Sequence, residues 1–366
     1  MILIVFLFLL FFWYIEKDKG SQGRRTYAIV VTIVIFLIGG LRNMAVYADT
    51  FGYVYRFNML QDLSVNDIKS TFTKDTFFYL FTYWIQPYIF NNYTLWFLLI
   101  SAVYIIPIGI IIYRYSDNPM WSWVCFFFIG LFMFSMAGLR QVVAMGIALI
   151  GFLLLMKKKD IWFFVLVWIA SLFHGTALIF VLIYPYVRFK IPFKKVMLIT
   201  YAALVVVLLV TGSGVMRPIV DYIGIQDERY VSYGENLRGS TYTYFLQQLI
   251  LFVPSIIILK KRLKEPRVAL FTNIAAIALV LVACSPIIAE MFRVAMYFSW
   301  GSIILFSIAM AEVLKTKPNV PAFFMISLLL YLIFINRTLL TEYYFWFEDT
   351  SDYILERYDT SFSLDL

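Results

Sequence analysis

The chain has 366 residues, of which 63% are hydrophobic and only 14% are charged, and its formal net charge is +8. This composition, with a mean hydropathy of +0.85, excludes a soluble globular protein and separate soluble domains. The basic residues lie in short clusters between apolar runs, which is typical of membrane topology and argues against a nucleic-acid partner. We therefore expect an all-α fold, in which residues 1–366 form a single polytopic membrane bundle.

The first apolar run, residues 1–15, resembles a signal peptide only superficially. No basic segment precedes it and no small-residue cleavage site follows it, so we interpret it as a span. The first basic cluster comes after it, at Lys17, Lys19, Arg24 and Arg25. The positive-inside rule then places the N-terminus outside and runs the first helix inward.

Further along the chain, apolar runs of near membrane-spanning length predict about twelve transmembrane helices. We place them at 1–15, 26–41, 95–113, 119–136, 140–156, 161–173, 176–187, 196–211, 241–259, 268–285, 292–313 and 320–335. Counting the aromatic run near 76–90 as a span would put the lysines at 157–159 outside. We therefore assign it as an interfacial or re-entrant helix within an extracytoplasmic loop, residues 42–94. The other extracytoplasmic segments are the loop 212–240 and an acidic, aromatic tail at 336–366, which puts the C-terminus outside.

Lysine and arginine are distributed differently between the predicted inner and outer segments. In the outer segments the only lysines are Lys69 and Lys74, whereas most of the arginines fall there. The outer arginines are Arg42, Arg56, Arg140, Arg217, Arg229, Arg238, Arg293, Arg337 and Arg357. Guanidinium groups form bidentate bonds to phosphate oxygens, so this bias favours a lipid-linked phosphate or diphosphate. The alternative is that these arginines reach lipid headgroups or pair with outer carboxylates.

Arg42 and Arg140 each follow a Gly-Leu pair at a helix boundary. Arg140 and Gln141 would open an inward-running helix, whose free N–H groups and dipole favour an anion. We take Arg42, Arg140 and Gln141 as candidate diphosphate ligands. An arginine that bonds to neighbouring carbonyls is the structural alternative.

Candidate bases lie on the same side. His174, the only histidine, sits at an outward turn between two short apolar runs, where it is either a structural residue or a general base. Asp49 is either a helix cap or a base that orients an acceptor hydroxyl. Its aromatic neighbours Tyr47 and Tyr53 are suited to packing on sugar rings.

Two further features carry charge. Glu290 and Arg293 would share one helical face, as a structural pair or as a competing base and a third anion ligand. The tail aromatics are either an interfacial belt or a binding surface for a sugar chain.

Cys125 and Cys284 lie inside apolar runs, so we predict no disulfide, and a single histidine argues against a zinc site. No outer Asp-x-Asp pair precedes the tail, so we expect neither metal nor other cofactor.

Three motifs in order resemble the EpsG family of Wzy-like polysaccharide-forming membrane proteins. They are Gly40-Leu41-Arg42 with Asp49-Thr50 and Tyr53, then Gly138-Leu139-Arg140-Gln141 with Ala144, then Phe173-His174 with Ala177. The resemblance covers roughly residues 1–190. It implies a GT-C-like fold in the bacterial plasma (inner) membrane.

The resemblance also implies the reaction. An inverting polymerase would join repeat units on undecaprenyl diphosphate, both donor and acceptor, at an active site facing outside. Arg42 and Arg140 would stabilise the leaving diphosphate, and Arg293 joins them by spacing alone. Membrane lipids, a flippase and a chain-length regulator would be its partners. Two alternatives stay open: a flippase or exporter of lipid-linked oligosaccharide, with charges on both halves of its spans, and a glycan O-acyltransferase that uses the single histidine.

Overall fold

The computed structural model describes residues 2–46, 48–189, 228–285, 291–317 and 343–348, with positions 198, 202, 205, 319, 324, 325, 327 and 350. Every regular element among them is a helix, apart from an isolated bridge between Arg42 and Phe345. The all-α prediction is confirmed. The chain divides into two compact units, and the single membrane domain stays a prediction. Unit 1 comprises Met1–Tyr113, Phe132–Leu178 and Ser327–Leu366, and unit 2 comprises Arg114–Leu131 and Ile179–Ile326.

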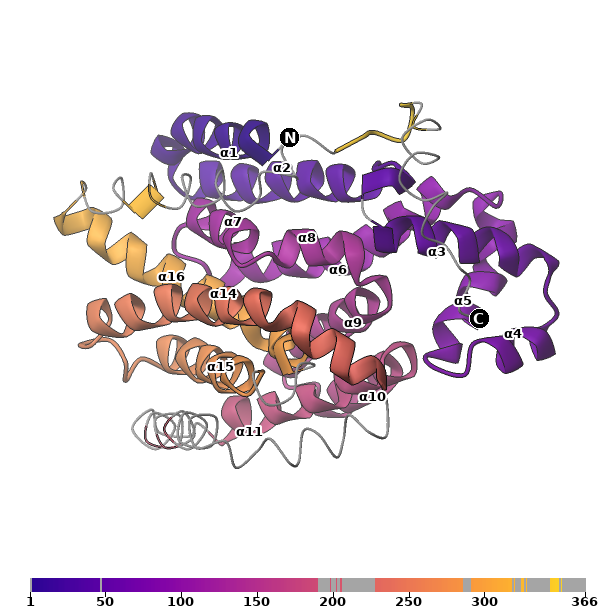
Figure 1. Cartoon of the computed structure of the whole chain (residues 1–366). Coiled ribbons are helices and arrows are strands. Elements are labelled where there is room, and N and C mark those ends of the chain that lie inside the picture. Colours follow the sequence, from indigo (N-terminus) through magenta and orange to yellow (C-terminus); the bar gives the residue numbers. More distant parts are fainter. Residues whose placement is uncertain are drawn as a thin grey trace. The chain divides into compact units, whose positions relative to one another are not determined.

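Unit 1 holds the N-terminal helices and the first candidate site residues (Figure 1). Its helices are α1 (Ile2–Glu16), α2 (Gly20–Gly40), α3 (Ala48–Met59), α4 (Val65–Thr71), α5 (Thr76–Ile85), α6 (Tyr93–Tyr115), α8 (Leu131–Ala137), α9 (Leu139–Met156) and α10 (Asp160–Phe173). The end residues of α6 and α8 cross the boundary into unit 2.

Helices α1 and α2 form a hairpin closed by the short turn Lys17–Lys19 (Figure 1). Tyr27 of α2 donates its hydroxyl hydrogen to the carbonyl of Leu9 at 3.2 Å, and its ring contacts Phe12 and Trp13 of α1. At the same end of α2, Arg24 donates to the carbonyl of Tyr113 near the end of α6.

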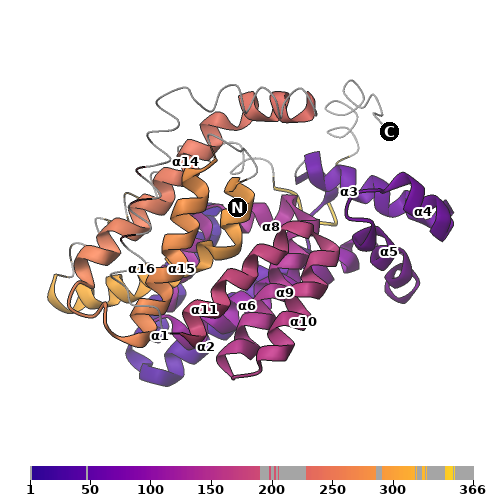
Figure 2. The ribbon, with the colours of Figure 1, turned by 90° about the horizontal axis from the view of Figure 1, so that it is seen from below.

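The central helices of unit 1 approach one another closely. A Cβ added to Gly146 of α9 would lie 2.2 Å from the carbonyl oxygen of Val103 on α6, so only glycine fits there. Ser101 of α6 donates to the carbonyl of Phe36 on α2 at 2.9 Å. Small residues and interhelical hydrogen bonds are the usual means of association in a membrane, where lipid removes the hydrophobic driving force. Helix α10 folds back along α9 (Figure 2).

Three short helices, α3, α4 and α5, gather at one end of unit 1 (Figure 1). The run predicted as an interfacial or re-entrant helix forms α5 followed by a 3-10 turn at Gln86–Ile89. Phe77 and Phe81 of α5 place their rings edge-on against Phe173 at the end of α10. Gln86 donates from its side chain to the carbonyl of Phe57 on α3 at 2.5 Å, which fixes α3 and α5 together.

Unit 2 is built around three long helices. Its elements are α7 (Pro119–Phe128), α11 (Ile183–Arg188), α14 (Glu228–Ile258), α15 (Pro266–Ala283) and α16 (Met291–Thr316). Buried polar pairs join α14 to α16, because Tyr244 donates to Ser299 and Ser302 donates to Gln248, both at 2.7 Å. Helix α14 begins at Glu228, so residues 228–240, predicted as loop, are its first turns.

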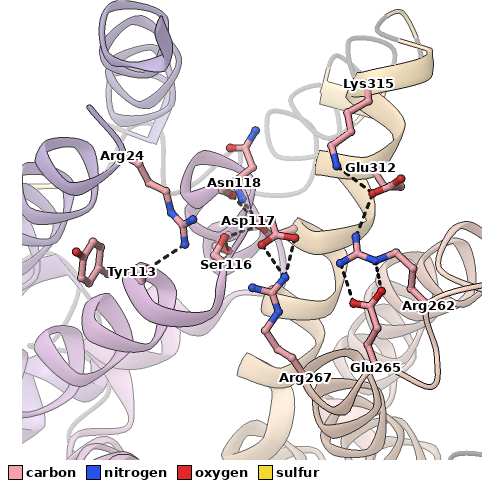
Figure 3. Close-up of polar contacts among 12 residues, drawn as sticks. Arg24, Tyr113, Ser116, Asp117, Asn118, Arg262, Glu265, Arg267, Glu312 and Lys315 are labelled. Carbon is pink, nitrogen blue, oxygen red and sulfur yellow. Dashed lines mark hydrogen bonds and ion pairs between the residues drawn. The ribbon is translucent and has the colours of Figure 1, made fainter. Parts of the chain in front are cut away.

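One end of unit 2 carries a network of ion pairs (Figure 3). Arg267 bonds both carboxylate oxygens of Asp117, at 2.7 and 2.8 Å. Arg262 binds Glu265 and also Glu312, whose carboxylate accepts a further bond from Lys315. Asp117 precedes α7, and the other residues follow α14 or lie at the end of α16, all in or directly beside segments that the sequence predicts to be cytoplasmic.

The described residues include five helical stretches long and apolar enough to cross a membrane. They are Leu7–Gly40, which contains the α1–α2 turn, Tyr93–Tyr115, Leu139–Met156, Pro266–Ala283 and Met291–Thr316. The predicted span 119–136 consists of α7 and α8, which pass the same test together and are bent by 55° at a break that contains Gly130, whose φ of 72° suits glycine. The predicted span 176–187 begins as a 3-10 helix, Gly175–Leu182. The spans 196–211 and 320–335 lie outside the fully described residues, and the twelve-span topology stays a prediction.

Candidate functional site

The candidate site lies in unit 1, where helix ends and the short helices meet. Asp75, at the residue before α5, is the centre of the site. Its Oδ2 atom is 3.0 Å from Nη1 of Arg140, at the start of α9, and 3.0 Å from Nδ1 of His174, at the end of α10. One carboxylate oxygen therefore joins two of the residues that the sequence analysis selected.

Asp75 occupies the N-cap position of α5, yet its side chain does not cap the helix. Aspartate at this position commonly accepts a bond from the first-turn N–H groups. Here the carboxylate turns toward Arg140 and His174, and the backbone adopts the left-handed region with φ of 55°. Aspartate tolerates that region better than most residues, and such strain concentrates at functional sites.

The electrostatics keep Asp75 ionised. Burial opposes the charge, with 9% of the side chain exposed. The hydrogen bond from His174 and the attraction of His174, Arg140 and Lys74 outweigh burial and lower the pKa of Asp75 from its ordinary value. An ionised carboxylate favours the tautomer in which Nδ1 of His174 carries the hydrogen, which leaves Nε2 as an acceptor.

Arg140 is held on two sides. Nε donates to the Tyr53 hydroxyl at 3.3 Å, while Nη1 pairs with Asp75. The ring of Tyr53 in turn rests edge-on against Phe78 of α5. Among the described residues, no protein acceptor is bonded to Nη2 of Arg140, and 29% of the side chain is exposed. A partly buried guanidinium with donors to spare is suited to an anionic ligand.

Arg42, which follows α2, is only 1% exposed. It donates to the carbonyl of Gly39, at the end of α2, and to that of Met136, near the end of α8. Its guanidinium also lies 4.0 Å from the ring centre of Phe97. The hypothesis that Arg42 binds diphosphate stays a prediction, and these contacts favour the structural alternative, in which it fixes the chain just before Arg140.

The remaining candidates lie elsewhere. Asp49 is exposed in the first turn of α3. Gln141 is 3% exposed, with its amide nitrogen 3.9 Å from the sulfur of Met145. Arg293 belongs to unit 2, with its guanidinium 5.7 Å from the ring centre of Phe292. Tyr47 and Glu290 lie outside the described residues.

Part of the tail docks beside Arg42. Asn43 donates its backbone N–H to the carbonyl of Tyr344 at 2.9 Å and its side-chain amide to that of Glu348 at 3.0 Å. Trp346 donates its backbone N–H to the carbonyl of Leu41 at 3.0 Å. The rings of Trp346 and Phe347 are mostly exposed. This segment therefore presents aromatic surface at the end of unit 1 that holds the candidate site.

Sequence reasoning missed Asp75. The available signal was an aspartate directly before a predicted helix, in the position where a cap is expected. Among the described residues, no three His, Cys, Asp or Glu side chains are grouped so as to hold a metal ion. The metal-free prediction is not tested by that observation.

These features define a helical, membrane-embedded protein with a charged site where several helix ends meet. The chain belongs to the EpsG family, whose match extends over residues 25–351. It is thus a membrane protein of polysaccharide biosynthesis with a glycosyltransferase-like character, and the predicted family membership is confirmed. Neither a curated protein nor a solved structure shows significant similarity to it.

Proposed function

We propose that this protein is a polysaccharide polymerase that joins repeat units carried on undecaprenyl diphosphate at the outer face of the bacterial plasma membrane. The observation that carries the proposal is the shared oxygen of Asp75, which sets an anion-binding guanidinium and an imidazole side by side. Membership of a family of polysaccharide biosynthesis supports a glycan substrate.

The basic residues support an outward-facing site. Lys157, Lys158 and Lys159 follow the end of α9, whereas Arg140 stands at its start. The 18 residues of α9 span roughly 27 Å at 1.5 Å per residue, about the thickness of the hydrocarbon core. Lysine-rich ends face the cytoplasm by the positive-inside rule, so Arg140, Asp75 and His174 would face outward.

Arg140 would act on the leaving group. As the bond between the anomeric carbon and the diphosphate oxygen breaks, its electron pair stays on that oxygen, and negative charge grows there. The donors of Arg140 not used by Tyr53 and Asp75 are prepositioned to receive it. Because the charge is larger in the transition state than in the bound substrate, this contact accelerates the reaction.

His174 would act on the acceptor. Its Nδ1–H donates to Asp75, so Nε2 takes the proton from the acceptor hydroxyl as that oxygen attacks the anomeric carbon. The attack from the face opposite the diphosphate inverts the anomeric centre. Asp75 would orient the imidazole and stabilise its protonated form, as carboxylates do for catalytic histidines.

The test uses the purified protein in lipid nanodiscs, with the lipid-linked repeat unit extracted from the producing cell. We expect longer glycan from the parent, and losses on the order of 10²-fold or more for Arg140→Ala and His174→Ala. Arg25→Ala, an exposed arginine on α2, is the matched control and should retain activity. Equal extension by all variants would remove the proposed site. Translocation without bond formation would indicate an exporter, and acyl gain on the glycan an acyltransferase.

A further inference from the structure

An apolar cavity of about 300 Å³ lies within unit 1, lined by residues of α5, α6 and α9 and by Phe173 of α10. Its walls include Phe81, Leu99, Val143 and Ile147. The one hydroxyl in the lining belongs to Thr82 and is already bonded to the carbonyl of Phe78 at 2.8 Å. Apart from this hydroxyl and the indole N–H of Trp96, the lining is apolar, so the cavity favours hydrocarbon over sugar or phosphate.

This cavity begins where the polar site ends. Phe173 forms part of its wall and directly precedes His174. Val143 and Ile147 lie three and seven residues after Arg140 on α9, so they continue the same helical face. Phe78, another wall residue, contacts the ring of Tyr53, and the hydroxyl of Tyr53 accepts the hydrogen bond from Nε of Arg140. A charged layer thus passes into a hydrocarbon-lined layer within about one helical turn.

That boundary matches a polyprenyl diphosphate, whose charged group is bonded directly to a hydrocarbon chain. We propose that the cavity binds the diphosphate-proximal isoprene units of the lipid carrier, an inference that rests on the proposed function of the same site. A cavity of about 150 Å³ holds one benzene ring, so this one accommodates roughly two five-carbon units. Phe81, Leu99 and Ile147 are half-buried, so the rest of the chain leaves past them into the bilayer.

The experiment compares donors that carry the same repeat unit on ethyl, ten-carbon geranyl and full-length polyprenyl diphosphate. Each methylene transferred from water to an apolar site favours binding by about fourfold, so the parent should use the two longer donors with a much lower KM than the ethyl donor. Ile147→Phe narrows the cavity and should raise KM for the longer donors roughly tenfold. The KM for the ethyl donor should stay unchanged.

The matched control is Ile150→Phe on the same helix, at a side chain that is 38% exposed and outside the cavity lining. Leu99→Phe is a second filling variant on α6, and all variants should keep the parent's thermal unfolding temperature. If Ile147→Phe and Leu99→Phe both match Ile150→Phe on the long donors, or slow all three donors equally, the chain site is disproved. If the parent extends none of the donors, the proposed function itself fails.

A second arm separates the carrier chain from ordinary membrane lipid. A photoreactive group near the tenth carbon of the polyprenyl donor should crosslink to cavity residues in the parent and not in Ile147→Phe. A phospholipid with the same group on its acyl chain should not label these residues while the donor is present. Labelling by the phospholipid at equal strength would overturn the proposal in favour of a bound membrane lipid.

Discussion

Nδ1 of His174 lies 3.0 Å from Oδ2 of Asp75, although the two residues are 99 positions apart in the chain. The contact joins the end of α10 to the first residue before α5. Phe77 and Phe81 of α5 hold the same junction through Phe173. The imidazole is therefore held by the carboxylate of Asp75, and the backbone before it is held by the aromatic packing of Phe173, so changes at Asp75 should affect the chemistry of His174.

Asp75→Asn should distinguish a role of Asp75 in orienting His174 from a role in binding the lipid-linked donor. The amide fills the same space but removes the charge that fixes the tautomer of His174 and stabilises its protonated form. We expect kcat to fall roughly 10²-fold or more, with a smaller change in the KM for the lipid-linked donor. Steady-state glycan extension measures both constants. Lys69→Ala, at an exposed lysine on α4, is the control, and an unchanged kcat in Asp75→Asn would exclude an orienting role.

The same carboxylate predicts a pH dependence of stability. The pKa of Asp75 is lowered on folding, because the attraction of His174 and Arg140 outweighs burial. Its contribution to the free energy of unfolding is then present above the unfolded pKa, near 3.8, and is lost as the pH falls through the lower folded value.

The measurement is the difference in thermal unfolding temperature between the parent and Asp75→Asn. The contribution of the Asp75 carboxylate to this difference should be constant from pH 8 to about pH 5. That contribution should shrink only below about pH 4. A difference that disappears near pH 5 would show that the folded carboxyl is protonated more easily than an exposed one. In that case the ion pair with Arg140 would not be stabilising.

The helices were predictable because apolar runs and basic clusters leave strong local signals. The runs at 140–156 and 268–285 correspond closely to α9 and α15. The break within the predicted span 119–136 was not predictable, because Gly130 permits a left-handed turn that hydropathy does not register. The predicted loop residues 228–240 are helical because a polar helix has no apolar signature.

The site was predictable only in part. Arg140 and His174 stand at helix boundaries in apolar surroundings, where charge is costly and therefore conspicuous. Asp75 stands among other polar residues of a loop, where one carboxylate is not distinguished from the next, and its partners are 65 and 99 residues away. Arg42 has the same Gly-Leu-Arg pattern as Arg140, but its burial depends on packing against α8 and Phe97, which local sequence does not encode.

The orientation of unit 1 can be tested by labelling single cysteines in intact cells. Thr73→Cys, exposed in the turn before α5, should react with a membrane-impermeant maleimide added outside. Lys158→Cys, in the turn between α9 and α10, should react only after permeabilisation. The background is Cys284→Ser, since Cys125 is fully buried. Labelling of Lys158→Cys from outside would reverse the predicted topology and place the candidate site on the cytoplasmic face.

Variants of Arg42 test whether this residue supports the fold or binds the diphosphate. Arg42→Ala removes the bonds to the carbonyls of Gly39 and Met136 and leaves a space against Phe97. Hydrogen bonds to charged groups contribute about 1.5–3 kcal/mol each, so the loss of both should lower the free energy of unfolding by roughly 3–6 kcal/mol. Thr50→Val, which loses only a hydroxyl bond to the same Met136 carbonyl, should cost about 1 kcal/mol.

Arg42→Lys supplies the kinetic readout, because a lysine retains the charge but cannot reach both carbonyls with a planar group. If Arg42 supports the fold, the folded fraction of this variant should keep the parent's KM for the lipid-linked donor while its unfolding temperature drops. Arg140→Lys should show the opposite pattern, with near-parental stability and impaired turnover, since 29% of that side chain is exposed and it has donors to spare for substrate. A raised donor KM in Arg42→Lys at unchanged stability would restore Arg42 as a diphosphate ligand.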